Sequence, residues 1–414
     1  MKRFWPLLLL LSLLTACSGG GPQALNVTLV DGLGEPLQPL AGAWRLGPPP
    51  STAGLPWNAL PLSQTSWNLP IPPGTRFQVA FRCPSSGSAQ SYVSLDLSRA
   101  ELSSSLVVRC PSTYASPTVT VGGSLSQALQ SGTAASARGQ VSLSGAAFSS
   151  LPLPQGIGHE VGVFGVDSGG TPYFGRTGPI SVGPGTTLVG PISLAVTPTL
   201  TVTAPPGFLS EAGLILTTSV QLPLAAWPGG TQGVGRPSLS AKDFFQFWTY
   251  HGFSYAFWRM NAMDPAVAAG ATLNLGVPPL SLSGNQTHTT TVLPTFSSLS
   301  AGGFSPGLSF LGYALSLEEP GVRNWRHYLS PGALGSSSTY YVDLENAPGF
   351  SGVVPAPGQG VQLYASAFAG SQALSALLAA KPIPSETVTN HTLFLDRIWP
   401  VHLEAAFMQS SFTW

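Results

Sequence analysis

Short runs in which apolar and polar residues alternate recur along the chain, and turn residues separate these runs. Phe77, Val79 and Phe81 occupy every second position of one run, and Leu106 and Val108 do so in another. Because successive side chains of a strand point to opposite faces, such runs predict half-buried β-strands. The 48 Gly and 40 Pro residues lie largely between the runs, which is typical of all-β proteins. We therefore predict an all-β fold of tandem β-sandwich domains, Ig-like or transthyretin-like, with few short helices.

A Pro- and Gly-containing turn that leads directly into an alternating strand occurs three times, at 69–81, 151–164 and 354–365. The copies are unequally spaced, which favours repeated modules of one architecture over a regular solenoid. A two-sheet sandwich of about seven strands takes about 100 residues, so the chain has room for several. The predicted organisation is a signal peptide at 1–16, a tether at 17–23, a β-sandwich with a disulfide at 24–112, a β-sandwich at 117–200, a β-rich domain with an aromatic cluster at 201–293, and a β-sandwich with a short helix at 294–414.

Two segments depart from the strand pattern and predict short helices. Residues 240–243 have the form of a capping box, and aromatic residues follow it at helical spacing as far as Trp248. Gly252 should end this helix, after which residues 253–257 alternate as a strand. Residues 372–380 are good helix formers and predict a helix of two or three turns.

The most unusual composition is that of residues 244–258, where nine of fifteen residues are aromatic, against 10% in the whole chain. In one interpretation these rings form core, with Tyr and Trp polar atoms hydrogen-bonded at its edge. In another, Trp248, Tyr250 and Trp258 line a platform or cleft for a glycan or an apolar ligand, and His251 supplies a polar contact. A third interpretation, contact with lipid headgroups, is weakened by the lack of Lys and Arg in 244–258.

Charge is scarce, since charged residues make up 8% of the chain against about 25% in typical soluble proteins. No dense basic run occurs, and this excludes nucleic acid as a partner, because neutralising phosphates requires clustered Lys and Arg. The hydrophobic content of 43%, together with the clear alternation, excludes a disordered chain.

The N-terminus combines Lys2 and Arg3 with an apolar stretch at 4–14 and then Leu14-Thr15-Ala16-Cys17. The stretch is too short for a membrane span, which needs ~20 residues. This arrangement resembles the signal sequence and lipobox of bacterial lipoproteins. The resemblance implies that the thiol of Cys17 receives a diacylglyceryl group and that Cys17 becomes the mature N-terminus, followed by the flexible tether. The alternative is an ordinary cleaved signal peptide with Cys17 as a bystander.

With Cys17 acylated, Cys83 and Cys110 remain as an even pair outside the reducing cytosol. Each lies in the sequence Arg-Cys-Pro-Ser and closes an alternating segment, so both sulfurs should point into one apolar layer. We predict a disulfide between them, with two buried free thiols as the alternative. A redox site is disfavoured because the chain has no Cys-x-x-Cys.

The opening pattern from Leu25 to Pro36, LNVTLVDGLGEP, resembles the first strand of transthyretin-like or carboxypeptidase-regulatory-like modules. The resemblance covers about a quarter of one domain and implies a β-sandwich there.

Residues 303–307 match the Gly-x-Ser-x-Gly motif of hydrolase nucleophile elbows. Asp343 and then His391 or His402 follow in the chain order of a hydrolase catalytic triad. The residue after the serine is Pro306, which has no N–H to donate to an oxyanion. We therefore predict a tight turn at this motif and no catalytic serine.

No cofactor site and no metal site are predicted. The six histidines, at 159, 251, 288, 327, 391 and 402, are scattered, and no His-Glu-x-x-His occurs. His402 and Glu404 would share a strand face, but two ligands make no metal site. No Walker loop or dinucleotide fingerprint is present.

These patterns predict a lipid-anchored cell-envelope protein on the extracytoplasmic side, at the outer membrane or the cell surface, with a structural, display or binding role and no catalysis. Its partners would be the membrane, through the lipid, and a glycan or an envelope protein. The alternative is an extracytoplasmic glycan-binding or glycan-processing accessory protein that uses residues 244–258. An enzyme should join Trp248, Tyr250 or Trp258 to an acid such as Asp243 or Asp264.

Overall fold

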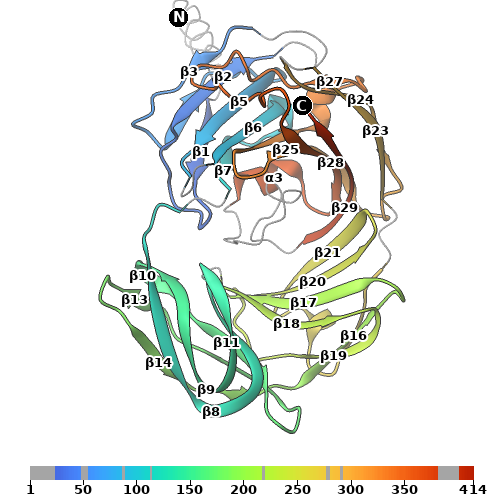
Figure 1. The fold of residues 1–414 in the computed structure, drawn as a ribbon. Coiled ribbons are helices and arrows are strands. Elements are labelled where there is room, and N and C mark those ends of the chain that lie inside the picture. The colour runs from blue at the N-terminus through green and yellow to red at the C-terminus, as the bar shows by residue number, and fades with distance from the viewer. Residues whose placement is uncertain are drawn as a thin grey trace, which may run out of the picture.

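The computed structural model describes residues 24–47, 55–85, 89–111, 114–216, 220–276, 280–289, 292–380 and 401–414. Strands make up 59% of the structure and helices 5%, which confirms the all-β prediction. Figure 1 shows two lobes, with one large sheet running from the upper into the lower. The described part of the chain holds no helix with the length and apolar character that a membrane span requires.

The central sheet has twelve strands among the described residues. Neighbouring strands in this sheet are antiparallel, except that β26 and β6 run parallel to each other. The order across the sheet is β18 (Gln221–Trp227), β17 (Leu209–Ile215), β20 (Phe244–His251), β21 (Ser254–Asn261), β29 (Val401–Thr413), β28 (Gly360–Gly370), β25 (Ser309–Glu319), β26 (Arg323–Leu329), β6 (Gln90–Ser98), β5 (Arg76–Cys83), β2 (Ala41–Leu46) and β3 (Asn58–Ala59).

In the upper lobe the central sheet is buried on both faces. One face, here called the β1 side, packs against β4 (Ser66–Leu69), β1 (Leu25–Val30), β7 (Ser105–Arg109) and α3 (Leu374–Ala379). The opposite face, the β24 side, packs against β23 (Ser281–Thr289), β24 (Val292–Gly302), β27 (Tyr340–Tyr341) and α2 (Pro331–Leu334). Three layers of backbone therefore enclose two apolar cores.

In the lower lobe, β16 (Thr199–Ala204), β19 (Gly230–Gly235) and β22 (Thr272–Asn274) cover the β24 side of the central sheet. A further sheet has the order β14 (Leu188–Ile192), β8 (Thr118–Ser136), β11 (Gly162–Val166), β12 (Pro172–Arg176) and β15 (Ala195–Val196), with β9 (Gly139–Pro154) also paired to β8. The remaining elements are β10 (Gly156–His159), which pairs with β13 (Ile180–Val182), and the short 3-10 helices η1 (Arg99–Glu101) and η2 (Pro265–Val267).

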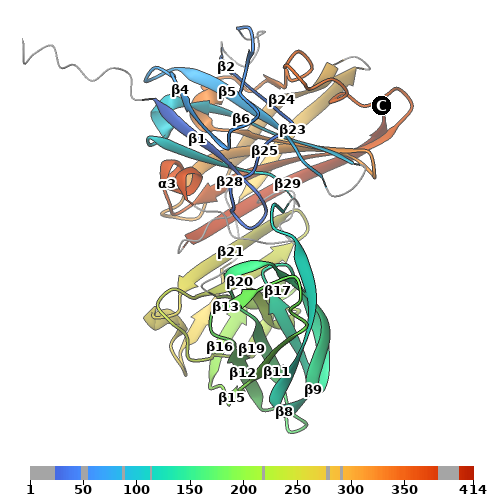
Figure 2. The ribbon, with the colours of Figure 1, turned by 90° about the vertical axis from the view of Figure 1, so that its left-hand side faces the viewer.

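The central sheet joins parts of the chain that the sequence separates into modules. It takes strands from 24–112, 201–293 and 294–414, and Figure 2 shows β21 and β20 below β29 and β28. Two predicted boundaries require correction, since 200/201 falls inside β16 and 293/294 inside β24. The division of the chain into four domains stays a prediction.

Of the two predicted helices, one is confirmed and one is wrong. The helix at 372–380 is confirmed as α3, whereas residues 244–251 form strand β20. The carboxylate of Asp243 does accept hydrogen bonds from the amide and hydroxyl of Ser240, at 2.8 Å each, as in a capping box. The chain nevertheless continues extended, because β20 pairs along its length with β17 and β21 and tertiary pairing overrides the local helical spacing.

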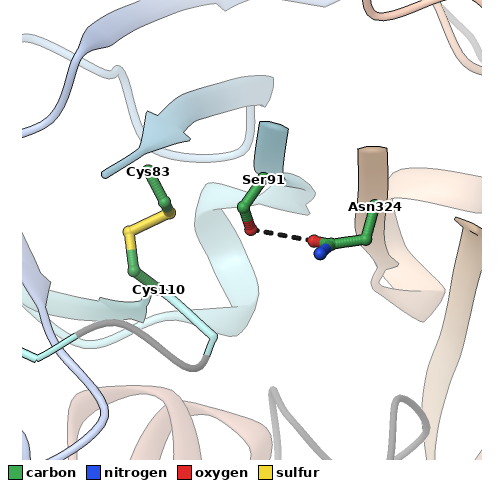
Figure 3. Close-up of a disulfide and its surroundings, with 4 residues drawn as sticks. All are labelled: Cys83, Ser91, Cys110 and Asn324. Carbon is green, nitrogen blue, oxygen red and sulfur yellow. Dashed lines mark hydrogen bonds between the residues drawn. A yellow bond between two sulfur atoms is a disulfide. The ribbon is translucent and has the colours of Figure 1, made fainter. Parts of the chain in front are cut away.

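The predicted disulfide is confirmed between Cys83 and Cys110, with a Cα–Cα distance of 5.7 Å (Figure 3). Both residues are buried in the core on the β1 side, so the interpretation as two free thiols is wrong. The bridge ties the end of β5 to the residue that follows β7. Closing the 27-residue separation stabilises the fold by roughly 3–4 kcal/mol in the chain-entropy account. Beside it, the Ser91 hydroxyl donates to Asn324 Oδ1 at 2.8 Å and joins β6 to β26.

Candidate functional site

The aromatic cluster forms the hairpin of β20 and β21, whose turn contains Gly252 with φ of 56°. A glycine suits this position because the left-handed region disfavours side chains. The strand predicted for 253–257 is confirmed within β21. Alternation distributes the rings over both faces of the central sheet, so the hairpin is part of two different cores.

The four predicted ligand-binding residues do not share one face. Trp248 and Tyr250 pack against the core on the β1 side. Trp258 packs against the core of the lower lobe on the β24 side, and His251 points the same way by alternation from Phe247, which pairs with Trp258. A platform that contains both Trp248 and Trp258 is therefore excluded.

On the β24 side, Trp258 stacks on His402, with ring centroids 4.9 Å apart. Nε2 of His402 lies 3.5 Å from Oε1 of the buried Glu404, as expected from their shared strand face. Burial lowers the pKa of His402, and the nearby Glu404 opposes this shift. His251 is exposed at the end of β20 and packs against Phe208, with centroids 4.9 Å apart.

On the β1 side, Trp248 and Tyr250 form a half-buried aromatic surface. Trp248 rests on Phe257, with ring centroids 4.6 Å apart. The Tyr250 hydroxyl donates to Oε1 of Glu211 at 2.7 Å, and burial followed by the neighbouring carboxylate raises the pKa of Tyr250. Glu211 is exposed on β17, directly opposite Trp248 in the register. We name Trp248, Tyr250 and Glu211 the aromatic–acid patch.

The acid of this patch is one that the sequence does not indicate. Asp243 and Asp264 are engaged elsewhere, since Asp243 forms a 2.9 Å ion pair with Arg176 and Asp264 caps η2 through Ala266. Glu211 lies 37 positions before Trp248, and only the pairing of β17 with β20 brings it to the rings. No sequence signal announces that pairing.

The hydrolase-like motif forms the predicted turn, between β24 and β25. The amide of Leu308 donates to the Ser305 carbonyl at 3.2 Å, and the Ser305 amide donates to Oε2 of Glu404 at 3.3 Å. Asp343 is buried in an ion pair with Arg45 at 2.7 Å, and His391 lies outside the described residues. Among the described residues, no histidine forms a hydrogen bond with the Ser305 hydroxyl.

Metal ligands are not gathered in the described part of the chain, where no group of three or more His, Cys, Asp or Glu side chains could hold an ion. Cys17, the predicted lipidation site, lies outside the described residues.

A buried hydrogen-bond network links β5, β6, β26 and β27, and the sequence does not predict it. The Asp96 carboxylate accepts hydrogen bonds from Nε of Arg76 at 2.7 Å, from Nε2 of Gln78 at 2.8 Å and from the Tyr340 hydroxyl at 3.0 Å. Asp96 is fully buried, and so is Tyr340. The buried carboxylate therefore pairs with the largely buried guanidinium of Arg76, and each compensates the charge of the other.

His327 continues this network through both ring nitrogens. Nε2 lies 2.7 Å from the Tyr340 oxygen, and Nδ1 lies 2.7 Å from the Ser94 hydroxyl. Because Tyr340 gives its proton to Asp96, Nε2 carries the hydrogen and Nδ1 accepts from Ser94. Burial, as the largest cause, lowers the pKa of His327 to about 3. Ser94 and His327 are directly paired on β6 and β26, so the network fastens the N-terminal to the C-terminal part of the central sheet.

Comparisons with known proteins add no family, because no protein-family model and no curated protein matches the chain.

Proposed function

We propose that this chain is a lipid-anchored cell-envelope protein with a structural, display or binding role and no catalysis. Acylation of Cys17 would hold it on the extracytoplasmic side of the outer membrane or at the cell surface. Multiple acyl chains give lasting attachment, at about 0.8 kcal/mol per buried methylene, so the proposal needs no second membrane segment.

The observation that carries the structural role is the continuity of the central sheet. Hydrogen-bonded neighbours run without interruption from β18 in the lower lobe to β3 in the upper lobe. A continuous ladder resists bending between lobes far better than a linker does. The seven residues of the predicted tether span at most about 25 Å when extended. This tether would hold the two lobes close to the lipid surface.

Cys17→Ser tests the anchor. We expect the wild type to incorporate labelled fatty acid and the variant to incorporate none, because the variant has no thiol to acylate. The paired substitution Cys83→Ser with Cys110→Ser is the matched control, since it removes two cysteines that the disulfide uses and should still incorporate the label. Labelling of Cys17→Ser, or an unlabelled wild type, would rule the anchor out.

A second candidate function, glycan binding, is favoured by the aromatic–acid patch. Half-buried rings offer a flat surface for the apolar face of a sugar ring. Among the described residues, only Tyr250 donates a hydrogen bond to the Glu211 carboxylate. Oε2 can therefore accept a hydrogen bond from a sugar hydroxyl.

Trp248→Ala tests this candidate against Trp258→Ala, a change of the same kind on the opposite face of the same hairpin. In a glycan screen with neutral and amino-sugar polysaccharides, Trp248→Ala should weaken binding about tenfold or more, equivalent to about 1.4 kcal/mol. Trp258→Ala should bind like the wild type. Equal losses in both folded variants, or wild-type affinity in Trp248→Ala, would exclude the patch as the glycan site.

A further inference from the structure

Among the described strands that pair with one neighbour, β9 is the longest. This strand spans Gly139–Pro154 and pairs with β8 alone. Figures 1 and 2 place the β8 and β9 hairpin on the outside of the lower lobe. Backbone N–H and C=O groups along such an edge can accept another strand.

Proteins usually protect their edge strands with short length, charge, proline or bulges. Before residue 152, β9 has only the last of these, since its ladder with β8 shifts register at three places. Neither β9 nor its partner β8 contains a charged residue. Proline is confined to the last three residues of β9, at 152 and 154. By contrast, the edge strands β3 and β22 have two and three residues, and β18 carries Pro223 in its interior. A long, uncharged edge is the kind that pairs between molecules.

The middle of β9 is chemically symmetric about the bond between Gly145 and Ala146. Its sequence from 142 to 149 is Ser-Leu-Ser-Gly-Ala-Ala-Phe-Ser, with a hydroxyl at each end, one large apolar residue inside each hydroxyl, and small residues between. Leu143 and Phe148 are both buried, whereas Ser142 and Ser149 are exposed.

A bend makes this symmetry possible. Leu143 and Phe148 are five positions apart and would face opposite ways on a regular strand. Gly145 has φ of 102°, and this departure from extended geometry lets both side chains face inward. A two-fold axis at the bend would set Leu143 of one copy against Phe148 of the other and exposed serine against exposed serine.

We propose that β9 pairs antiparallel with β9 of a second copy of this chain, around a two-fold axis near Ala146. Self-pairing sets Leu143 against Phe148, Ser142 against Ser149 and small residues against one another, and it meets no like-charge repulsion. A strand from an unrelated chain would need that pattern by coincidence. The dimer extends one sheet across two molecules, and it is independent of the proposed anchor and of the glycan patch.

The test uses the full secreted chain with Cys17→Ser, so that lipid does not drive association. Sedimentation velocity should show a concentration-dependent mixture of monomer and dimer. Ala146→Lys places two ammonium groups beside the axis and should weaken dimerisation at least tenfold. Gln130→Lys, an equal change at an exposed position of β8, should dimerise like the parent.

Charge complementation identifies the contact. Ala146→Glu alone should also be monomeric, and an equimolar mixture of Ala146→Glu and Ala146→Lys should recover the dimer. Thermal unfolding of each variant shows whether it is folded. The proposal fails if the parent is a monomer at every concentration, if folded Ala146→Lys dimerises like the parent, or if mixing restores nothing.

Discussion

Replacing Asp96 by Asn is expected to lower the free energy of unfolding by about 3–5 kcal/mol. The substitution keeps the side-chain shape but removes the charge that compensates Arg76, whose side chain is 12% exposed. It also turns one acceptor oxygen into an amide that cannot accept from Arg76, Gln78 and Tyr340 together. Urea unfolding at pH 7 measures the loss.

A double-mutant cycle separates this electrostatic cause from general damage to the core. Arg76→Gln alone leaves a buried carboxylate without its cation, and the double variant leaves no charge at all. The double variant should therefore be more stable than the sum of the two single losses implies, by at least about 1 kcal/mol. Asp264→Asn, at an exposed carboxylate, should cost at most about 1 kcal/mol. Additive losses at Asp96 and Arg76 would contradict the account of a neutralised buried pair.

Acid is expected to destabilise the fold through His327. Its folded-state pKa of about 3 lies below the unfolded value of 6.5, so below pH 6.5 the unfolded chain binds a proton that the folded chain rejects. The stabilisation is complete above pH 6.5 and is lost as the pH falls towards 3. Each pH unit in this window costs about 1.4 kcal/mol, up to about 5 kcal/mol in total.

His327→Gln isolates the contribution of His327 to the acid response. It removes the imidazole of this residue and leaves every other titratable side chain in place. The variant is less stable at neutral pH, since it loses bonds to Ser94 and Tyr340. Its free energy of unfolding should, however, fall by about 2 kcal/mol less than that of the wild type between pH 6.5 and 5. Urea unfolding across that range gives both slopes. Equal slopes would show that His327 does not control the acid response.

The sequence pattern correctly predicted several strands, the disulfide and α3, which depend mainly on nearby residues. Alternation located strands such as β5, and the matching contexts of Cys83 and Cys110 indicated their disulfide. Good helix formers predicted α3. In each case the side-chain period or the residue type is sufficient, because no distant partner changes the outcome.

Pairing between distant segments decided the rest. The helical spacing of residues 244–248 yielded to hydrogen bonding with β17 and β21 on both edges of β20. The four residues proposed as one ligand site divide between two faces because residues 248 and 250 alternate with 251, and Trp258 lies opposite Phe247. Alternation along one strand separates residues 248 and 250 from 251, whereas the face of Trp258 follows only from its pairing with Phe247.

The buried hydrogen-bond network around Asp96 also depends on pairing between distant segments. Asp96 and His327 are 231 positions apart in the sequence, and Tyr340 joins them only because β27 packs over the β24 side. His327 alone looks like any scattered histidine. Burial lowers its pKa, and it is the parallel pairing of β6 with β26, which no sequence period indicates, that places it beside Ser94.

Mass spectrometry of the mature N-terminal peptide, extracted from membranes, tests the central proposal most directly. We predict a peptide that begins at Cys17 and carries a diacylglyceryl group on its sulfur. A peptide that begins at another residue, or Cys17 with a bare thiol, would contradict it.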